Sequence, residues 1–169
     1  LDADTPAVDT DGDTLNDIVE AALGTDINLA DSDGDGIEDG PETKGGQPID
    51  TDNDGIIDAL DLDSDDDTVL DQVEGETDSD ADGVADYRDA DDDDDSIPTA
   101  IEGTADLDGD GLPNYLDEDS DGDGFGDFEE TGAGSDPYDP ASTPLNIHNP
   151  FIANIGDVGN DQGRRVRLN

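Results

Sequence analysis

The sequence has no cysteine, methionine or tryptophan, and only five lysine and arginine residues among its 169 residues. Without cysteine, the chain has no disulfide framework, thiolate metal site or thiol redox centre. Leucine, isoleucine, valine and phenylalanine together number 33, just under a fifth of the chain. No apolar run approaches the roughly 20 residues that a membrane helix needs, and no signal-peptide pattern opens the chain. We therefore expect no membrane span and no large apolar core. Because the first residue is Leu1, we also expect a processed or partial chain.

What the sequence has in excess is negative charge. It carries 52 acidic residues, for a formal net charge of −47. A chain so charged and so poor in apolar groups does not order by itself, because two like charges about 4 Å apart repel by about 4 kcal/mol at an effective dielectric of 20. Residues 1–144 hold 50 acids against Lys44 and Arg88, whereas 145–169 have a formal charge of +1. Multivalent cations are the economical way to neutralise the acidic part.

The acidic residues recur with a fixed period. Residues 50–77, 78–105 and 106–133 are three copies of 28 residues with no insertion between them. Each copy contains two loops of the form D-x-D-x-D-[GST]-φ-x-[DNT]-x-x-[DE], in which φ is apolar. Two further loops, 9–20 and 31–42, precede the copies. Spacing, apolar seventh position and closing acid repeat together, which argues against chance in an aspartate-rich chain.

There are thus eight loops. In chain order, loops one to eight span residues 9–20, 31–42, 50–61, 63–74, 78–89, 91–102, 106–117 and 119–130. Loops three, five and seven end in aspartate and are called Asp-closed below. The other five end in glutamate and are called Glu-closed.

The loop formula has the ligand spacing of a calcium site. Calcium takes six to eight oxygen ligands at about 2.3–2.6 Å, supplied by carboxylates at positions 1, 3, 5, 9 and 12 and the backbone carbonyl at position 7, with a sharp turn at position 6. The apolar side chains at position 7 are expected to form a thin seam of core. The candidate ligands are Asp9, Asp31, Asp50, Asp63, Asp78, Asp91, Asp106 and Asp119 at position 1; Asp11, Asp33, Asp52, Asp65, Asp80, Asp93, Asp108 and Asp121 at position 3; Asp13, Asp35, Asp54, Asp67, Asp82, Asp95, Asp110 and Asp123 at position 5; Leu15, Ile37, Ile56, Val69, Val84, Ile97, Leu112 and Phe125 at position 7; Asp17, Asp39, Asp58, Asp71, Asp86, Asn114 and Asp127 at position 9; and Glu20, Glu42, Asp61, Glu74, Asp89, Glu102, Asp117 and Glu130 at position 12.

The loops are not equivalent. Loop six has Ser96 at position 6 and Thr99 at position 9, loop seven has Asn114 at position 9, and loops one and four have Thr14 and Thr68 at position 6. We expect these to be the weaker or water-completed sites. Calcium, about eight ions or more, is the expected cofactor. Magnesium is less favoured because it prefers octahedral sites and keeps its waters, and all-oxygen ligation argues against zinc and copper.

An EF-hand uses the same loop formula but needs a helix on each side. Only one residue separates loop three from loop four, loop five from loop six, and loop seven from loop eight. No helix fits there, although 18–25 are expected to form one or two helical turns. The nonapeptide of calcium-binding β-rolls is also absent.

Residues 9–140, with the connectors ALGTDINLADSD (22–33) and GAGSDPYDP (132–140), resemble the thrombospondin type 3 repeat in its bacterial acidic form. The resemblance implies a chain wrapped around a line of calcium ions, with little helix or sheet and with carboxylates shared between neighbouring sites. It further implies extra ligands from Asp26, Asp66, Asp94 and Asp136. The paired cysteines of the animal members are missing, so stability is expected to depend more heavily on metal.

The expected fold is therefore irregular and low in secondary structure: an elongated calcium-organised repeat array, or calcium ladder, with a short C-terminal β-like tail. We expect a lead-in at 1–8, the repeats at 9–144 and an extended segment at 145–169. That segment is either a linker into a further domain or an assembly strand whose arginines dock on a neighbouring subunit.

No pattern indicates an enzyme. His148 is the only histidine, and no glycine-rich phosphate loop is present. The negative charge of the chain would repel the phosphates of nucleic acid. The leading hypothesis is an extracellular or cell-surface structural module, a calcium-stiffened rod in a filament, stalk or adhesin. Its expected partners are neighbouring subunits, head to tail, or another surface protein. The alternatives are an acidic calcium-storage or mineral-interacting protein without fixed assembly and, less favoured, an acidic mimic of nucleic acid.

Overall fold

A computed structural model describes residues 8–144 of the chain. Only 23% of this part is helical, and it contains no strand. The expected irregular chain, low in secondary structure, is confirmed for these residues. The lead-in up to residue 7 and the β-like tail predicted for 145–169 lie outside the described residues.

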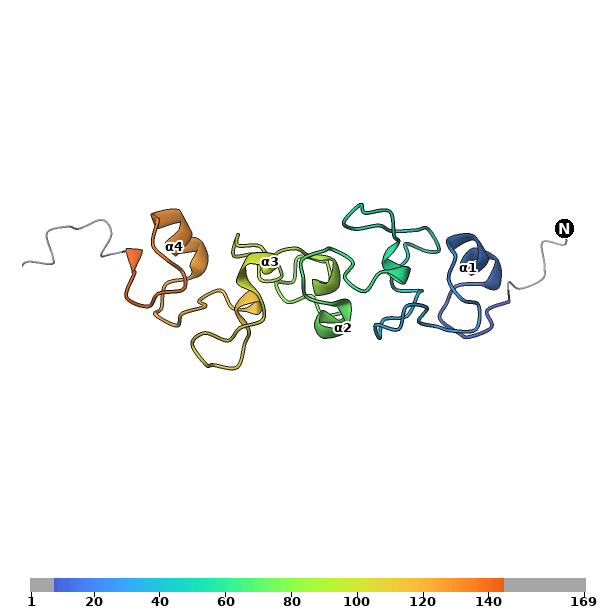
Figure 1. The fold of residues 1–169 in the computed structure, drawn as a ribbon, viewed down its shortest axis with the longest axis horizontal. Coiled ribbons are helices and arrows are strands. Elements are labelled where there is room, and N and C mark those ends of the chain that lie inside the picture. The colour runs from blue at the N-terminus through green and yellow to red at the C-terminus, as the bar shows by residue number, and fades with distance from the viewer. Residues whose placement is uncertain (1–7, 145–169) are drawn as a thin grey trace, which may run out of the picture.

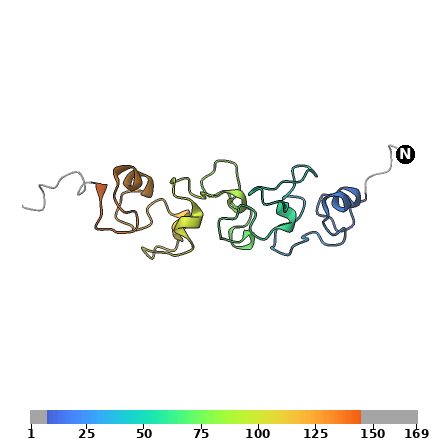
Figure 2. The ribbon, with the colours of Figure 1, turned by 45° about the horizontal axis from the view of Figure 1, so that its top comes forward.

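The described chain is elongated. Its loops follow one another along the long axis in the order of the sequence, from the loop before α1 at one end to the turns after α4 at the other (Figure 1). The view turned by 45° shows the same single row (Figure 2). Segments close in sequence are therefore neighbours in space, as in other repeat arrays.

Helices occupy the same place in each repeat. Every helix of the described part begins at position 9 of a loop, so the residue at position 12 lies one turn later on the same face. Asp-closed loops form 3-10 turns, the Glu-closed loops other than loop two form α-helices, and α1 and α4 end at the left-handed glycines Gly24 and Gly134. The elements are α1 Asp17–Leu23, η1 Asp58–Leu60, α2 Asp71–Glu74, η2 Asp86–Arg88, α3 Thr99–Glu102, η3 Asn114–Leu116 and α4 Asp127–Ala133.

Two hydrogen bonds recur in all eight loops. The backbone N–H of position 9 donates to the carbonyl of the residue before the loop, at 2.6–3.2 Å. The backbone N–H of position 7 donates to the carboxylate of position 5, at 2.7–2.9 Å. The first bond closes the loop into a ring, and the second fixes the position 5 side chain inside it.

The rings also share an unusual backbone. Positions 4 and 6 have positive φ in every loop, a region that costs an L-residue about 1–2 kcal/mol. Most loops place glycine at position 6. Thr14, Thr68 and Ser96 instead adopt φ of 84°, 86° and 76° there.

The seam of apolar side chains expected at position 7 forms only in part. Four Glu-closed loops bury this side chain to 8% exposure or less: Leu15, Ile37, Val69 and Ile97. The Asp-closed loops leave it 39–47% exposed, at Ile56, Val84 and Leu112, so the expectation was wrong for these three. They bury position 10 instead, through Ala59, Tyr87 and Tyr115. Position 10 is the middle residue of the 3-10 turn in each Asp-closed loop, and the turn buries it in place of position 7.

Acidic side chains fill the rest of the interior. Glu20, Glu42 and Glu130 are the largest of the fully buried side chains, each at most 1% exposed. Burying a carboxylate without compensation is very costly. The interior of this protein therefore requires a partner for each buried acid.

Candidate metal centres

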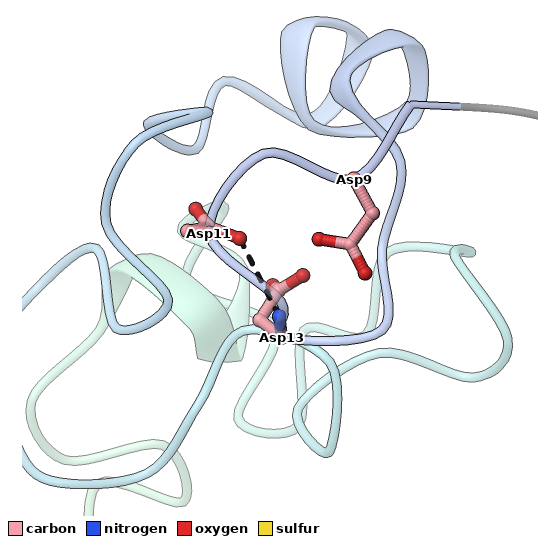
Figure 3. Close-up of side chains that lie close together, drawn as sticks. All are labelled: Asp9, Asp11 and Asp13. Atoms are coloured by element: carbon pink, nitrogen blue, oxygen red, sulfur yellow. Dashed lines mark hydrogen bonds between the residues drawn. The ribbon is translucent and has the colours of Figure 1, made fainter.

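The first three aspartates of a loop point into its centre. In loop one, Asp9, Asp11 and Asp13 converge on the space inside the ring (Figure 3). Their closest carboxylate oxygens lie within 4.8 Å of one another, as do those of the equivalent aspartates in loops two and three. Ligands on opposite sides of one calcium ion stand about 4.6–5.2 Å apart, so one ion fits each such group.

The backbone orients these carboxylates. At position 3, one oxygen accepts the N–H of position 5 at 2.9–3.4 Å in every loop. The second oxygen of Asp33, Asp65 and Asp93 is buried and has no hydrogen-bond donor. At position 5, Asp13 and Asp67 likewise accept a backbone N–H with one carboxylate oxygen and bury the other oxygen without a donor. Each side chain is thus held by one oxygen and offers the other.

The closing glutamates offer both oxygens. All five are 7% exposed or less, and none of their carboxylate oxygens has a hydrogen-bond donor: Glu20, Glu42, Glu74, Glu102 and Glu130. Burial, followed by repulsion from surrounding aspartates, raises the pKa of Glu42 and Glu74 to about 10 and that of Glu102 to about 9. Without a cation, burial and the neighbouring negative charges favour the protonated form of these glutamates.

Position 9 joins successive loops. The Asp71 carboxylate accepts the backbone N–H and the hydroxyl of Ser64, at position 2 of the same loop, at 2.8 and 2.6 Å. It also forms a group with Asp35 and Glu42 of loop two. Asp39 of loop two is likewise bonded to Ser32, and it groups with Asp13 and Glu20 of loop one.

The same link continues along the chain. The pKa of Glu74 in loop four is raised first by burial, then by Asp67 and Asp65 of the same loop, and then by Asp92 of loop six. Asp92 therefore lies close to Glu74. Asp127 of loop eight acts in the same way on Glu102 of loop six. Four carboxylates therefore connect the Glu-closed loops in succession, and we call them the linking carboxylates: Asp39, Asp71, Asp92 and Asp127.

The Asp-closed loops form a second class. Their closing residues Asp61, Asp89 and Asp117 have a raised pKa, from burial and from aspartates at positions 3 and 5, so position 12 does lie beside the ring. Several of the predicted ligands in these loops are nevertheless exposed, namely Asp54, Asp78, Asp82, Asp106, Asp108 and Asp110. The extra ligands that the resemblance implied are exposed too: Asp26, Asp66, Asp94 and Asp136. Because these carboxylates face solvent, water competes with them for any bound ion.

Residues outside the loop formula surround the linked sites. Tyr87, Tyr115 and Tyr138 have a raised pKa, from burial and then from nearby charges that include Glu42, Glu74 and Glu102 respectively. All three tyrosines of the chain thus stand beside successive Glu-closed sites. The sequence signal was present, because Tyr87 and Tyr115 both occupy position 10 of an Asp-closed loop, but the loop formula assigns that position no role.

An arginine side chain neutralises one of the buried aspartates within the repeats. Arg88 Nε lies 2.7 Å from Asp58 Oδ2, and its guanidinium stacks 4.6 Å from the centroid of the Tyr87 ring. Asp58 is 1% exposed and also accepts from Thr51. It is a predicted metal ligand, but here a guanidinium supplies the positive charge.

The remaining ligands complete an all-oxygen set. None of the eight carbonyl oxygens at position 7 accepts a hydrogen bond from another described residue. No helix of residues 8–144 is long and apolar enough to cross a membrane. No protein-family model matches the chain, and no curated protein is significantly similar to it. The residues themselves must therefore carry the functional argument.

Proposed function

We propose that this chain is a structural calcium-binding repeat module of the thrombospondin type 3 kind, a rod that calcium stiffens. The observation that carries the proposal is the set of five buried closing glutamates whose oxygens have no donor. Each faces aspartates that also offer an unpartnered oxygen. An array of this kind needs a cation at every Glu-closed loop to become stable.

Calcium fits this donor set better than other ions. The groups contain carboxylate and carbonyl oxygens, with neither histidine nor cysteine, which favours a hard cation. Calcium accepts six to eight such ligands in a tolerant geometry, whereas magnesium demands near-ideal octahedra. Because the chain carries 52 acidic residues, metal binding and folding are expected to be one process.

Equilibrium dialysis against calcium, magnesium and zinc tests this proposal. We expect tight binding of at least five calcium ions per chain, one for each Glu-closed loop, with magnesium and zinc competing poorly. Glu42→Gln is expected to lose one tight ion. Glu38→Gln, an exposed acid of the same loop outside the ligand positions, is the matched control and is expected to lose none. Equal loss in both variants, or zinc displacing calcium, would overturn the proposal.

The rod is proposed to work outside the cell or at its surface, in a filament, stalk or adhesin. Millimolar calcium is available there to fill weak as well as tight sites. Its partners are proposed to be neighbouring copies, head to tail, or another surface protein. Electron microscopy in millimolar calcium tests this assembly, and dispersed particles at all concentrations would contradict it.

A second candidate is calcium storage or contact with a mineral, without fixed assembly. The exposed aspartates of loops five and seven favour it, because solvent-facing carboxylates exchange ions readily. A storage protein needs charge but no fixed register. The hydrogen bonds that repeat in all eight loops therefore favour the rod.

A further inference from the structure

A groove of about 590 Å³ lies where loops five, six and eight meet. Loop five contributes Asp80 and Asp82, and loop six contributes Asp93 and Asp95. The wall on the other side comes from Glu118, before loop eight, and from α4. It is an open groove between repeats, so a side chain from outside the described residues has room to enter it.

Calcium in the loops leaves two acids of this groove without a metal. The aspartates of loops five and six that line it are candidate calcium ligands, Asp94 among them through the resemblance, but Glu118 and Glu129 line it as well. Both glutamates are exposed and neither is a candidate ligand. The groove therefore stays negative when the loops are filled, and its occupant must be cationic.

The α4 wall adds an aromatic face. Phe128 lines the groove and is 64% exposed, so its ring is open to an occupant. A ring beside carboxylates is the setting in which a guanidinium stacks and forms ion pairs at once. Arg88 already does this within the repeats, against Tyr87 and Asp58.

The chain contains one segment of matching chemistry. Residues 164–167 have the sequence RRVR and hold three of the five basic residues of the protein. Nineteen residues lie between residue 144 and this segment, so the 20 steps from residue 144 to Arg164 span at most about 66–72 Å. Eleven residues lead from Ala133, the end of the groove-lining helix α4, to residue 144, where the described chain ends. A short tether of this kind gives an effective concentration on the order of millimolar.

We propose that the groove is an arginine-binding site, and that its occupant is segment 164–167 of the same chain. One guanidinium stacks on Phe128 and pairs with Glu118 and Glu129. The inference rests on the proposed function only in that calcium fills loops five and six.

The absence of tryptophan makes a single-site reporter possible. Phe128→Trp is introduced into the full chain, with and without the triple change Arg164→Gln, Arg165→Gln and Arg167→Gln. In calcium, we expect acrylamide to quench the tryptophan about twofold less when the arginines are present. The protection must also be independent of protein concentration from about 1 to about 100 µM, because the contact is intramolecular.

Matched variants separate the groove from general charge. Glu118→Gln with Glu129→Gln is expected to remove the protection, whereas the exposed pair Glu38→Gln and Glu76→Gln is expected to keep it. Ile101→Trp is the reporter control, since Ile101 is 68% exposed in loop six and does not line the groove. Acrylamide quenching of the tryptophan in Ile101→Trp is expected to be the same with and without the three arginines.

Two outcomes overturn the proposal. Equal quenching with and without the arginines means that the segment does not dock. Protection that grows with protein concentration means that the occupant is a second copy. X-ray scattering on the same samples distinguishes the two proposals. A chain that calcium fails to compact refutes the proposed function, whereas a compact chain with an unprotected tryptophan refutes only the docking of segment 164–167.

Discussion

Asp92 and Thr99 have exchanged the roles that their positions have in the neighbouring loops. In loop four, Ser64 at position 2 donates to Asp71 at position 9. In loop six, Asp92 stands at position 2 and its backbone N–H donates to the hydroxyl of Thr99, at 3.3 Å. Both residues are buried, at 1% and 0% exposure. The exchange keeps one carboxylate at the junction with loop four.

This exchange predicts which site each residue serves. Asp92→Asn is expected to weaken calcium binding at loop four, whose Glu74 it faces, by about tenfold. The double variant Asp92→Ser with Thr99→Asp restores the arrangement of loop four and is expected to recover the affinity. Calorimetric titration of the three chains measures this. A double variant weaker than Asp92→Asn would show that the exchange is not what preserves the site.

The two classes of loop predict two classes of ion. Asp67 and Asp54 both occupy position 5, but Asp67 is 2% exposed in a Glu-closed loop and Asp54 is exposed in an Asp-closed loop. Asp67→Asn is therefore expected to remove a tight ion, with affinity falling about tenfold or more, and Asp54→Asn only a weak one. Hydrogen exchange in calcium should show lost protection in loops two, four and six for Asp67→Asn, and near loop three alone for Asp54→Asn. Identical losses would refute the distinction.

Backbone strain at position 6 predicts a stabilising change. Thr68 is β-branched and has φ of 86°, where glycine is at ease. Thr68→Gly is expected to raise the free energy of unfolding in calcium by about 1 kcal/mol, after the greater freedom of glycine in the unfolded chain is allowed for. Thr77→Gly, at an exposed residue without positive φ, is the control and is expected to destabilise slightly. Thermal unfolding distinguishes the two signs.

The internal cation predicts a change in stability without a change in ion number. Arg88→Gln leaves the buried Asp58 carboxylate with only its Thr51 partner, so we expect a loss of about 1–3 kcal/mol. Calcium stoichiometry is expected to stay the same, because a guanidinium and not calcium neutralises Asp58. Lys44, the other basic residue of the described part, is exposed, so Lys44→Gln is expected to leave the free energy of unfolding unchanged. An additional bound ion in Arg88→Gln would show that calcium replaces the arginine.

The irregular chain could be predicted because only one residue separates the paired loops, which leaves no room for a helix between them, and because the thrombospondin type 3 resemblance implied little helix or sheet. The loop formula also placed positions 3, 5 and 12 beside one another, since those distances are local. It named Asp39, Asp71 and Asp127 as ligands of their own loops but did not show which neighbouring loop each one reaches, because the contact of Asp71 with Asp35 depends on how two rings stack. Nor did it reveal which apolar side chains are buried: in loop five, the 3-10 turn at positions 9–11 buries Tyr87 at position 10 and leaves Val84 at position 7 exposed. The formula also assigns no role to Asp92, so the hydrogen bond from its backbone N–H to Thr99 could not be predicted, and the expectation that loop six is a weaker site stays a prediction.

If calcium supplies the stability that the apolar core lacks, removing calcium must unfold the chain. Small-angle X-ray scattering with far-ultraviolet circular dichroism, recorded during a calcium titration and after EGTA, is the decisive measurement. We expect an expanded chain without calcium, a compact elongated particle with calcium, and full reversal by EGTA. Dimensions and a spectrum that do not change with calcium would mean that the buried glutamates are stable without a cation, and that calcium does not drive folding.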